Sequence, residues 1–199
     1  MSDCTSKIKT AIDYHERTEH SLPDRFAASL GYLDWVTQPD PFRIYEGAER
    51  FQLPLCEPSS ASEPSWTITR SNTPIQPSTF DKTTFSQLLY DSLAISAWKK
   101  AGPSSWALRC NPSSGNLHPT EAYVLTGPID GLTPQPALLH YAPRDHAVEA
   151  LRWLDPKVFS DFCQQLPSNA FVLGLSSIVW REAWKYGERA FRYCMHDVG

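Results

Sequence analysis

The 199-residue chain lacks several features that would point to common classes of protein. It has no run of about eighteen apolar residues, so a membrane-spanning helix is not predicted. Residues 1–20 are polar and charged and lack the apolar centre of a secretory signal peptide. The formal charge of −4 argues against general affinity for nucleic acid or for an anionic membrane surface. The predicted location is the cytoplasm.

Cysteine and glycine are both sparse. The five cysteines are odd in number and scattered, and none forms a C-x-x-C pair. Neither a disulfide framework nor a zinc site is therefore predicted, and we expect reduced thiols. Seventeen prolines stand against nine glycines, mostly in the first 140 residues. That excess favours extended segments and turns over long helices.

The chain divides into three successive segments by composition. Residues 1–55 predict an N-terminal helix over 3–17, followed by an irregular arm rich in proline and aromatic residues. Residues 56–79 are dominated by Ser, Pro and Thr and predict a linker. Ordered periodicity returns at Phe80, so 80–199 is predicted to form the main domain.

Two helices and a hairpin are predicted in the first part of that domain. Thr83 or Thr84 is expected to cap a half-buried helix that ends near Gly102 and Pro103. Residues 121–127 and 136–143 predict strands joined by a turn over 130–135. Asp155 followed by Pro156 is typical of a helix N-terminus.

The C-terminal part reads as a strand followed by a helix. Residues 170–179 form a nearly continuous apolar run, which predicts a central strand covered on both faces. Residues 181–199 carry apolar positions at intervals of three to four and predict one helix. Since that pattern stops at Gly199 without a separate cap sequence, either Gly199 ends the helix or the chain is truncated, and truncation is favoured.

The stretch from Arg109 to Glu121 is the first candidate for chemistry. Gly115 allows backbone angles closed to other residues, while Ser113, Ser114 and Asn116 offer short donors and acceptors. Arg109 adds a permanent charge suited to a phosphate or an electron-rich ring edge. The same residue types also build ordinary tight turns, so both interpretations stay open.

Two further features are open in the same way. His118 is either a base or a hydrogen-bonded structural residue. Residues 181–193 carry a dense charged band that would be a solvated helix face, yet it directly follows the most apolar strand. Within it, Lys185 and Tyr186 are adjacent proton-transfer groups.

Two ordered motifs resemble those of a known family. R-x-x-P-S-x-G-x-x-x-P-x-E, at 109–121, resembles a signature of the nitroreductase superfamily in its SagB-type branch, the ThcOx-like peptide azoline dehydrogenases. W-K-Y-G-E-R-x-x-R-Y-x-x-H-D-V-G, at 184–199, resembles the second signature of that branch. Residues 14–21 and 33–48 resemble leader segments of longer bacterial members, so the resemblance covers the N-terminal portion of such a protein.

The resemblance implies an α+β fold with a mixed sheet flanked by helices, cut short at its C-terminus. It also implies an FMN cofactor at a dimer or repeat interface, so the expected partner is a second copy or a completing domain. The flavin-contacting loop falls on Arg109, Ser113, Ser114, Gly115 and Asn116, and the catalytic pair falls on Lys185 and Tyr186. No metal is implied. The implied substrate is a small molecule or a modified peptide, whose azoline ring is oxidised by hydride loss to the flavin while a base removes a proton.

Two alternatives remain at this level. A non-catalytic or incomplete copy would act as an interaction module and would not retain the cofactor. A general NAD(P)H-dependent nitro- or quinone reductase would share the cofactor but not the peptide substrate, and the adjacent Lys185 and Tyr186 favour the peptide branch.

Overall fold

The computed structural model describes residues 2–21, 26–55, 70, 79–167 and 170–199. The chain clusters into two compact units, each assembled from separate stretches. The first unit comprises Met1–Pro41, Pro112–Glu121 and Leu175–Gly199, and the second comprises Phe42–Asn111 and Ala122–Gly174. Of the predicted linker, only Arg70 and Thr79 lie within the described residues. The division into arm, linker and domain therefore stays a prediction.

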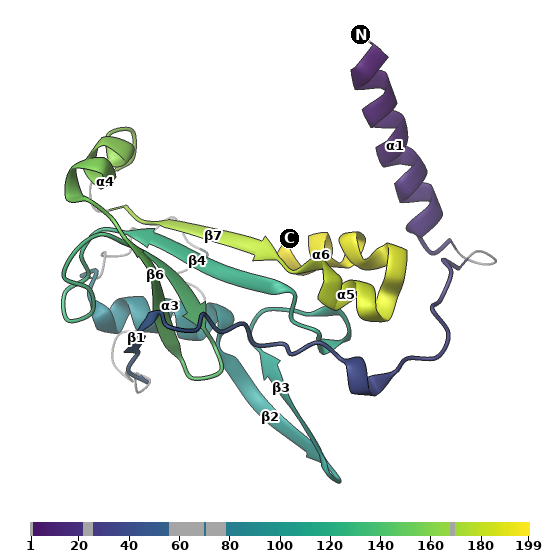
Figure 1. Ribbon diagram of the computed structural model, residues 1–199, viewed down its shortest axis with the longest axis horizontal. Coiled ribbons are helices and arrows are strands. Elements are labelled where there is room, and N and C mark those ends of the chain that lie inside the picture. The colour runs from purple at the N-terminus through teal and green to yellow at the C-terminus, as the bar shows by residue number, and fades with distance from the viewer. Residues whose placement is uncertain (1, 22–25, 56–69, 71–78, 168–169) are drawn as a thin grey trace. The chain divides into compact units, whose positions relative to one another are not determined.

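The elements follow one another as a mixture of helices and strands (Figure 1). In chain order they are α1 (Ser2–Thr18), η1 (Trp35–Thr37), β1 (Glu49–Gln52), α3 (Lys82–Leu93), β2 (Ile95–Ala101), β3 (Ser104–Arg109), η2 (Ser114–Asn116), β4 (Thr120–Thr126), β5 (Ala137–Ala142), β6 (Ala147–Trp153), α4 (Pro156–Cys163), β7 (Val172–Ser177), α5 (Val179–Tyr186), η3 (Gly187–Arg189) and α6 (Ala190–Val198), where η denotes a 3-10 helix.

The main sheet has five strands in the order β1-β6-β5-β4-β7. The pairings of β1 with β6, β6 with β5 and β5 with β4 are antiparallel. The predicted hairpin of β4 and β5 is confirmed, with Tyr123 opposite His140 and Thr126 opposite Ala137. A sheet with flanking helices confirms the predicted α+β class.

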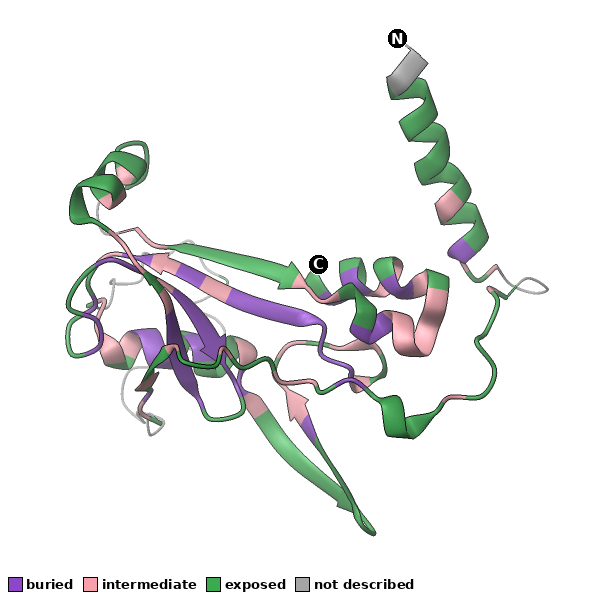
Figure 2. Cartoon of the chain, in the orientation of Figure 1, coloured by how far each residue is buried: buried purple, intermediate pink, exposed green. Residues whose placement is uncertain are grey.

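The hydrophobic core of the second unit joins α3 to this sheet. Phe85 and Leu89 of α3 are fully buried, in one cluster with Val124, Leu139 and Val148 from the strands. Figure 2 shows the same distribution, with buried residues concentrated in α3, β4, β5 and β6. Burial of each such side chain contributes about 1.5–3 kcal/mol, so this cluster is the main source of stability in the unit.

A buried histidine ties α3 to the strands. The Ser86 hydroxyl donates to the Pro54 carbonyl, so it accepts from Nε2 of His146 at 2.8 Å. The Nδ1 atom of His146 then accepts from the Tyr141 hydroxyl, also at 2.8 Å. Burial lowers the pKa of His146, because the imidazolium form loses its hydration, although a hydrogen bond with Pro54 opposes this. These bonds need the neutral ring.

Three predicted helices and their caps are found, with one correction. The helix predicted over 3–17 is α1, and Asp155 caps α4 by accepting from the amides of Lys157 and Val158. The cap of α3 is Asp81, not Thr83 or Thr84, because its carboxylate accepts from both of their amides. This capping box holds the pKa of Asp81 below its usual value, chiefly through the Thr84 amide.

The end of α3 was predicted wrongly. The helix ends at Leu93, and residues 95–109 form the hairpin of β2 and β3 instead. Ala101 pairs with Ser104, which leaves Gly102 and Pro103 as a two-residue turn. Gly102 has φ +58, which fits the first turn position of a hairpin that calls for glycine. The Gly-Pro signal therefore marks a hairpin turn and not a helix end.

The strand prediction over 170–179 is right in type and wrong in environment. β7 lies at the end of the strand order, and its side chains are exposed or intermediate, including Leu173 and Leu175. An apolar run predicts burial only where neighbouring elements cover it, and that information is not in the run. Strands β1 and β6 were not predicted, since β1 lies in the predicted arm and β6 carries Glu149 and Arg152 among its apolar residues.

The single helix predicted over 181–199 is two helices. α5 ends at Tyr186, η3 follows, and α6 runs from Ala190 to Val198. The break falls at Gly187, whose φ of +55 belongs to the left-handed region. Glycine reaches that region without steric cost, so it ends one helix while the apolar period continues in the next.

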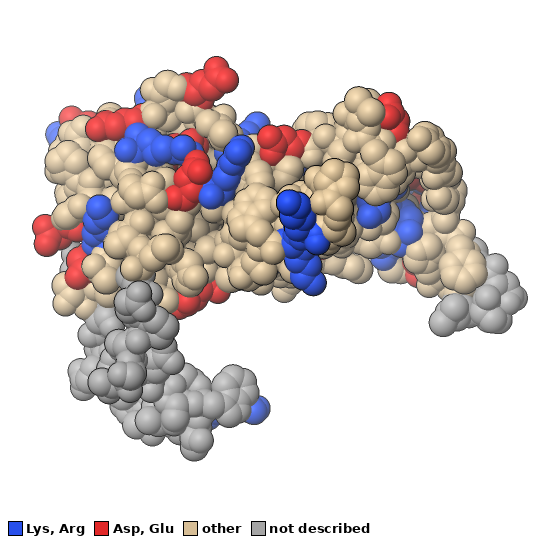
Figure 3. All heavy atoms as spheres, turned by 90° about the horizontal axis from the view of Figure 1, so that it is seen from below, with Lys and Arg blue, Asp and Glu red and all other residues tan. Residues whose placement is uncertain are grey.

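Several whole-chain features bear on function. Among the described residues no helix is long and apolar enough to cross a bilayer, and no group of three or more His, Cys, Asp or Glu could hold a metal. Cys4, Cys110, Cys163 and Cys194 are free thiols. On the face shown in Figure 3, acidic and basic side chains lie interspersed.

Candidate functional site

All six predicted site residues outside β3 belong to the first unit. Ser113, Ser114, Gly115 and Asn116 form the turn around η2, and Lys185 with Tyr186 ends α5. Arg109 belongs to the second unit, at the end of β3, where its guanidinium lies 5.4 Å from the centre of the Phe42 ring. Its cofactor role remains a prediction.

Gly115 is the point of closest approach between the turn and α5. It has φ +65, and a Cβ atom built on it would lie 2.6 Å from the Tyr186 hydroxyl and 3.0 Å from Nζ of Lys185. Both the backbone conformation and the missing side chain are therefore needed here. The turn and the Lys-Tyr pair, about seventy residues apart in sequence, form one continuous surface.

The turn is anchored to α6 by Asp197. The Asp197 carboxylate accepts from the Ser114 amide at 3.0 and 3.1 Å and from its hydroxyl at 2.8 Å. The Ser113 hydroxyl accepts from the His118 amide at 2.7 Å. The hydroxyls predicted to contact a cofactor are thus also the groups that hold the turn in shape. Asp197, buried at 8% exposure, was not among the predicted site residues.

His118 is held through its main chain. Its φ of +50 is unusual for a residue with a side chain, and Asn116 has φ +61. The His118 carbonyl accepts from Arg181 at 2.6 Å, and its side chain is buried. Of the two interpretations left open by sequence, these contacts favour the structural one.

Arg181 joins the turn to β4 through a buried ion pair. The Nη1 atom of Arg181 donates a hydrogen bond to Oε1 of Glu121 at 2.6 Å, and both side chains are almost fully buried. A buried pair of this kind is costly to break, because either charge alone would remain without a partner. The charged band over 181–193 is therefore not a uniformly solvated helix face, since Arg181 lies in the interior.

Glu182 is a second residue of this region that sequence reasoning missed. It is fully buried, and neither carboxyl oxygen has a hydrogen-bond partner among the described residues. Burial and the neighbouring Asp197 raise the pKa of Glu182 to about 8, while Lys185 opposes the rise. Its spacing of three and four residues before Lys185 and Tyr186 was the available signal, because such residues share a helix face.

The Lys-Tyr pair combines a cation with a phenol. Nζ of Lys185 lies 5.5 Å from the centre of the Tyr186 ring, and the Tyr186 and Tyr193 ring centroids are 4.3 Å apart. Burial, and next the carboxyl of Glu182, raise the pKa of Tyr186, so its phenol keeps its proton at neutral pH. The arrangement can hold a proton at Tyr186 and present a positive charge beside it.

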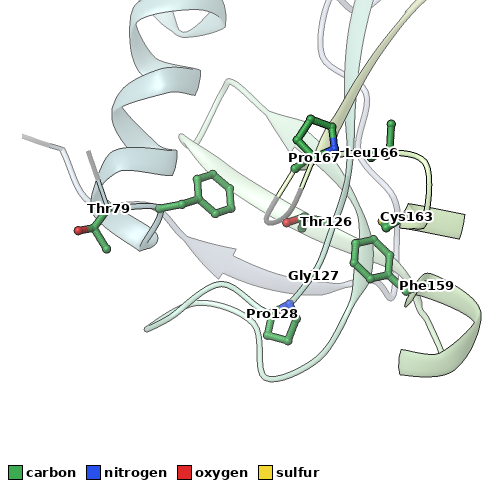
Figure 4. A pocket seen from close by; sticks show the side chains of 10 residues that line it. Thr79, Thr126, Gly127, Pro128, Phe159, Cys163, Leu166 and Pro167 are labelled. Carbon is green, nitrogen blue, oxygen red and sulfur yellow. The ribbon is translucent and has the colours of Figure 1, made fainter. Parts of the chain in front are cut away.

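The second unit contains a separate groove. A hollow of about 760 Å³ lies beside α4 and the end of β4 and is lined by Phe80, Thr126, Phe159, Cys163 and other small or apolar residues (Figure 4). None of the predicted site residues lines it, and its described lining has no carboxylate, histidine or lysine.

Comparison with known proteins supports a family at the level of the fold. No protein-family model and no curated protein matches the chain. It is similar to a crystal structure from Anabaena variabilis whose nitroreductase assignment is provisional, with 26% identity and a TM-score of 0.65. That match covers 94% of this chain and 35% of the other, so the chain spans about a third of the related protein.

A second structure is the Escherichia coli microcin synthetase McbBCD complex with truncated pro-MccB17 bound. The identity is 17% and the TM-score 0.46, over 94% of this chain and 67% of the other, which is too distant to carry an argument. The first match shows that the chain has part of a nitroreductase-like fold, as the resemblance implied.

Proposed function

We propose that this chain is a unit of an FMN-dependent oxidoreductase that dehydrogenates an azoline or a related peptide-derived substrate. The observation that carries the proposal is the contact of the Gly115 turn with Lys185 and Tyr186. Two sequence motifs with no local reason to interact meet there. The nitroreductase-like fold supports the same reading.

The residues of the first unit fit a flavin. The turn around Gly115 lets backbone approach a flat ligand closely, and Lys185 supplies a positive charge suited to an electron-rich ring. Ser113, Ser114, Gly115 and Asn116 would hold the cofactor through backbone and hydroxyl groups, and Arg109 would add a charge. When bound, FMN supplies the hydride acceptor.

The protein's own contribution is orientation and proton transfer. Tyr186 keeps its proton on the hydroxyl at neutral pH, so it orients or protonates a substrate heteroatom. Lys185 beside it holds a proton at Nζ and accepts one when its amine is neutral. Asp197 keeps the turn in register with both, through its bonds to Ser114.

A second candidate is a general NAD(P)H-dependent nitro- or quinone reductase. The structure from Anabaena variabilis, described provisionally as a nitroreductase, favours it. Such an enzyme would oxidise NAD(P)H in the presence of a nitroarene or quinone without any peptide. Azoline dehydrogenation would instead proceed without NAD(P)H and would yield an azole. The substrate assays therefore separate the two, and a small molecule or modified peptide is the partner in either case.

The site assignment is tested by removing the pair. Lys185→Ala and Tyr186→Phe should slow substrate oxidation at least tenfold while the bound FMN, measured by its visible absorption, stays nearly unchanged. Arg109→Ala should instead lower FMN content first. Exposed Lys157→Ala and Tyr32→Phe are matched controls that should change neither quantity.

FMN content distinguishes a catalytic role of the Lys-Tyr pair from a cofactor-binding or structural one. If Lys185→Ala and Tyr186→Phe both lose FMN, the pair binds cofactor or is structural, and its catalytic role is wrong. If the wild-type chain takes up no FMN, either alone, as a homodimer or with a completing domain, the non-catalytic interaction module is the better description.

A further inference from the structure

Glu182 lies where the catalytic pair is anchored but has no established task. It precedes Lys185 by three residues and Tyr186 by four on α5, so the three side chains share one face of the helix. Its side chain is 0% exposed, and both carboxyl oxygens lack a hydrogen-bond partner among the described residues. A buried carboxylate without a partner is strongly disfavoured, whereas a neutral acid is tolerated.

The facing helix makes a second negative charge still less favourable. Asp197 on α6 is buried and already accepts two kinds of hydrogen bond from Ser114. Cys194 on α6 is also buried, and burial together with Glu182 raises the pKa of its thiol to about 11. Around Glu182, then, the thiol is neutral, the Asp197 carboxylate is bound to the turn, and Arg181 on α5 is committed to Glu121.

Lys185 shares the helix face of Glu182, and its ammonium lies close to other groups. Its Nζ lies 3.0 Å from the Cβ position of Gly115 and 5.5 Å from the centre of the Tyr186 ring. No ion pair joins it to Glu182 in the part of the chain that the structure describes. Ionised Glu182 would attract this ammonium, since three-residue spacing on a helix allows the contact.

We propose that Glu182 is a positioning residue whose protonation state decides where Lys185 lies. As a neutral acid it leaves Lys185 against the Gly115 turn, next to Tyr186. When it gives its proton to solvent, the carboxylate draws Lys185 into an ion pair and away from the turn. The consequence for turnover rests on the proposed function, but the protonation and the movement do not.

The first experiment measures the carboxyl group itself, without cofactor. The infrared band of a protonated carboxyl should be present in the wild-type chain at pH 7, disappear with a midpoint near pH 8, and be missing in Glu182→Gln. Because the folded pKa is raised, the unfolding midpoint of wild type should fall relative to that of Glu182→Gln as pH rises from about 4.5 through 8, and taking this difference removes the opposite contribution of His146. Glu182→Met, an apolar variant of similar size, should also show no such fall and guards against misfolding of the Gln variant.

The second experiment tests the link to Lys185. Lys185→Met removes the cation that favours the carboxylate, so it should move the infrared midpoint of Glu182 to higher pH. Lys157→Met on exposed α4 is the control and should leave the midpoint in place. In the FMN-loaded wild-type protein, the rate of substrate oxidation should fall about tenfold for each pH unit above 8. This alkaline limb of the pH-rate profile should be absent in Glu182→Gln.

Three results would overturn the proposal: an ionised Glu182 at pH 7, an infrared midpoint unmoved by Lys185→Met, or an alkaline limb that survives in Glu182→Gln. Failure to bind FMN would count against the proposed function alone, because the infrared and unfolding measurements need no cofactor.

Discussion

At the scale of single residues, the site depends on the absence of a side chain at Gly115. A Cβ there would overlap the Tyr186 hydroxyl and press on Lys185, and the positive φ would strain any other residue. Gly187 has a similar requirement on the other side of the pair, where a Cβ would lie 2.9 Å from Cδ2 of Leu30. Two glycines therefore allow the close packing that places the Lys-Tyr pair.

Gly115→Ala should both destabilise the chain and disturb the site. The positive φ alone costs about 1 kcal/mol, and the overlap with Tyr186 adds to it by moving the phenol. Chemical denaturation measures the loss of stability, and FMN absorption measures the site. Gly102→Ala is the matched control, because Gly102 also has positive φ but has no heavy atom within 4 Å of its Cβ position.

The comparison of Gly115→Ala with Gly102→Ala separates the effect of the contact with α5 from the effect of the positive φ. Gly102→Ala should cost about 1 kcal/mol and leave FMN uptake unchanged, whereas Gly115→Ala should cost more and weaken uptake at least tenfold. Equal losses in the two variants would mean that the turn can move away from α5 without consequence, and the close approach would then have no functional meaning.

At the scale of elements, three segments hold α5 and α6 in place. The η2 turn is bound through Asp197, and Arg181 reaches the carbonyl of His118. The N-terminal helix α1 contributes Tyr14, whose hydroxyl donates to the Glu188 carbonyl at 2.9 Å and accepts from the Arg192 amide at 3.1 Å. Helices of eight and nine residues are too short to be stable alone, so these bonds define their position.

Asp197→Ala should release the η2 turn from α6. The Ser114 amide and hydroxyl would lose their acceptor, which costs on the order of 1–3 kcal/mol for buried groups bonded to a charge. FMN uptake should weaken at least tenfold, measured by titration of visible absorption. The exposed Asp13 of α1 provides the control variant Asp13→Ala, which should affect neither stability nor uptake. Unchanged uptake in Asp197→Ala would show that the turn does not bind the cofactor.

At the scale of the whole molecule, pH acts on the two units in opposite directions. Burial lowers the pKa of His146 in the second unit, so the folded state prefers the neutral ring that accepts from Tyr141 and donates to Ser86. In the unfolded chain the same ring titrates near 6.5. Protonation therefore favours unfolding.

Stability should fall as pH decreases below about 6.5, by up to about 1.4 kcal/mol for each pKa unit of the shift. Urea unfolding between pH 7 and 4 measures it. The useful quantity is the difference between wild type and His146→Gln, because the contribution of Glu182 cancels in that difference. His196→Gln, at an exposed histidine of α6, should leave the pH dependence intact. A pH-independent difference would show that His146 binds its proton equally well in the folded and unfolded states, so that burial does not lower its pKa.

The sequence alone determined the local features whose causes are local. Asp155 and Pro156 predicted the start of a helix, and turn residues between two short apolar runs predicted the hairpin of β4 and β5. The two motifs, through their resemblance to a known family, also predicted that the turn around Gly115 and the Lys-Tyr pair belong to one site. The helix start and the hairpin depend on neighbours within a few residues, whereas the pairing of the two motifs came from the resemblance.

The tertiary structure decided the rest, because burial and long-range contact are not written in a local pattern. Only the assembled sheet shows that β7 ends the strand order with exposed side chains, and that Gly102 turns a hairpin. Likewise, the spacing of Glu182 is ordinary for a solvated helix. Its burial against α6, beside Asp197 and without a hydrogen-bond partner in the described chain, is what makes it a neutral acid.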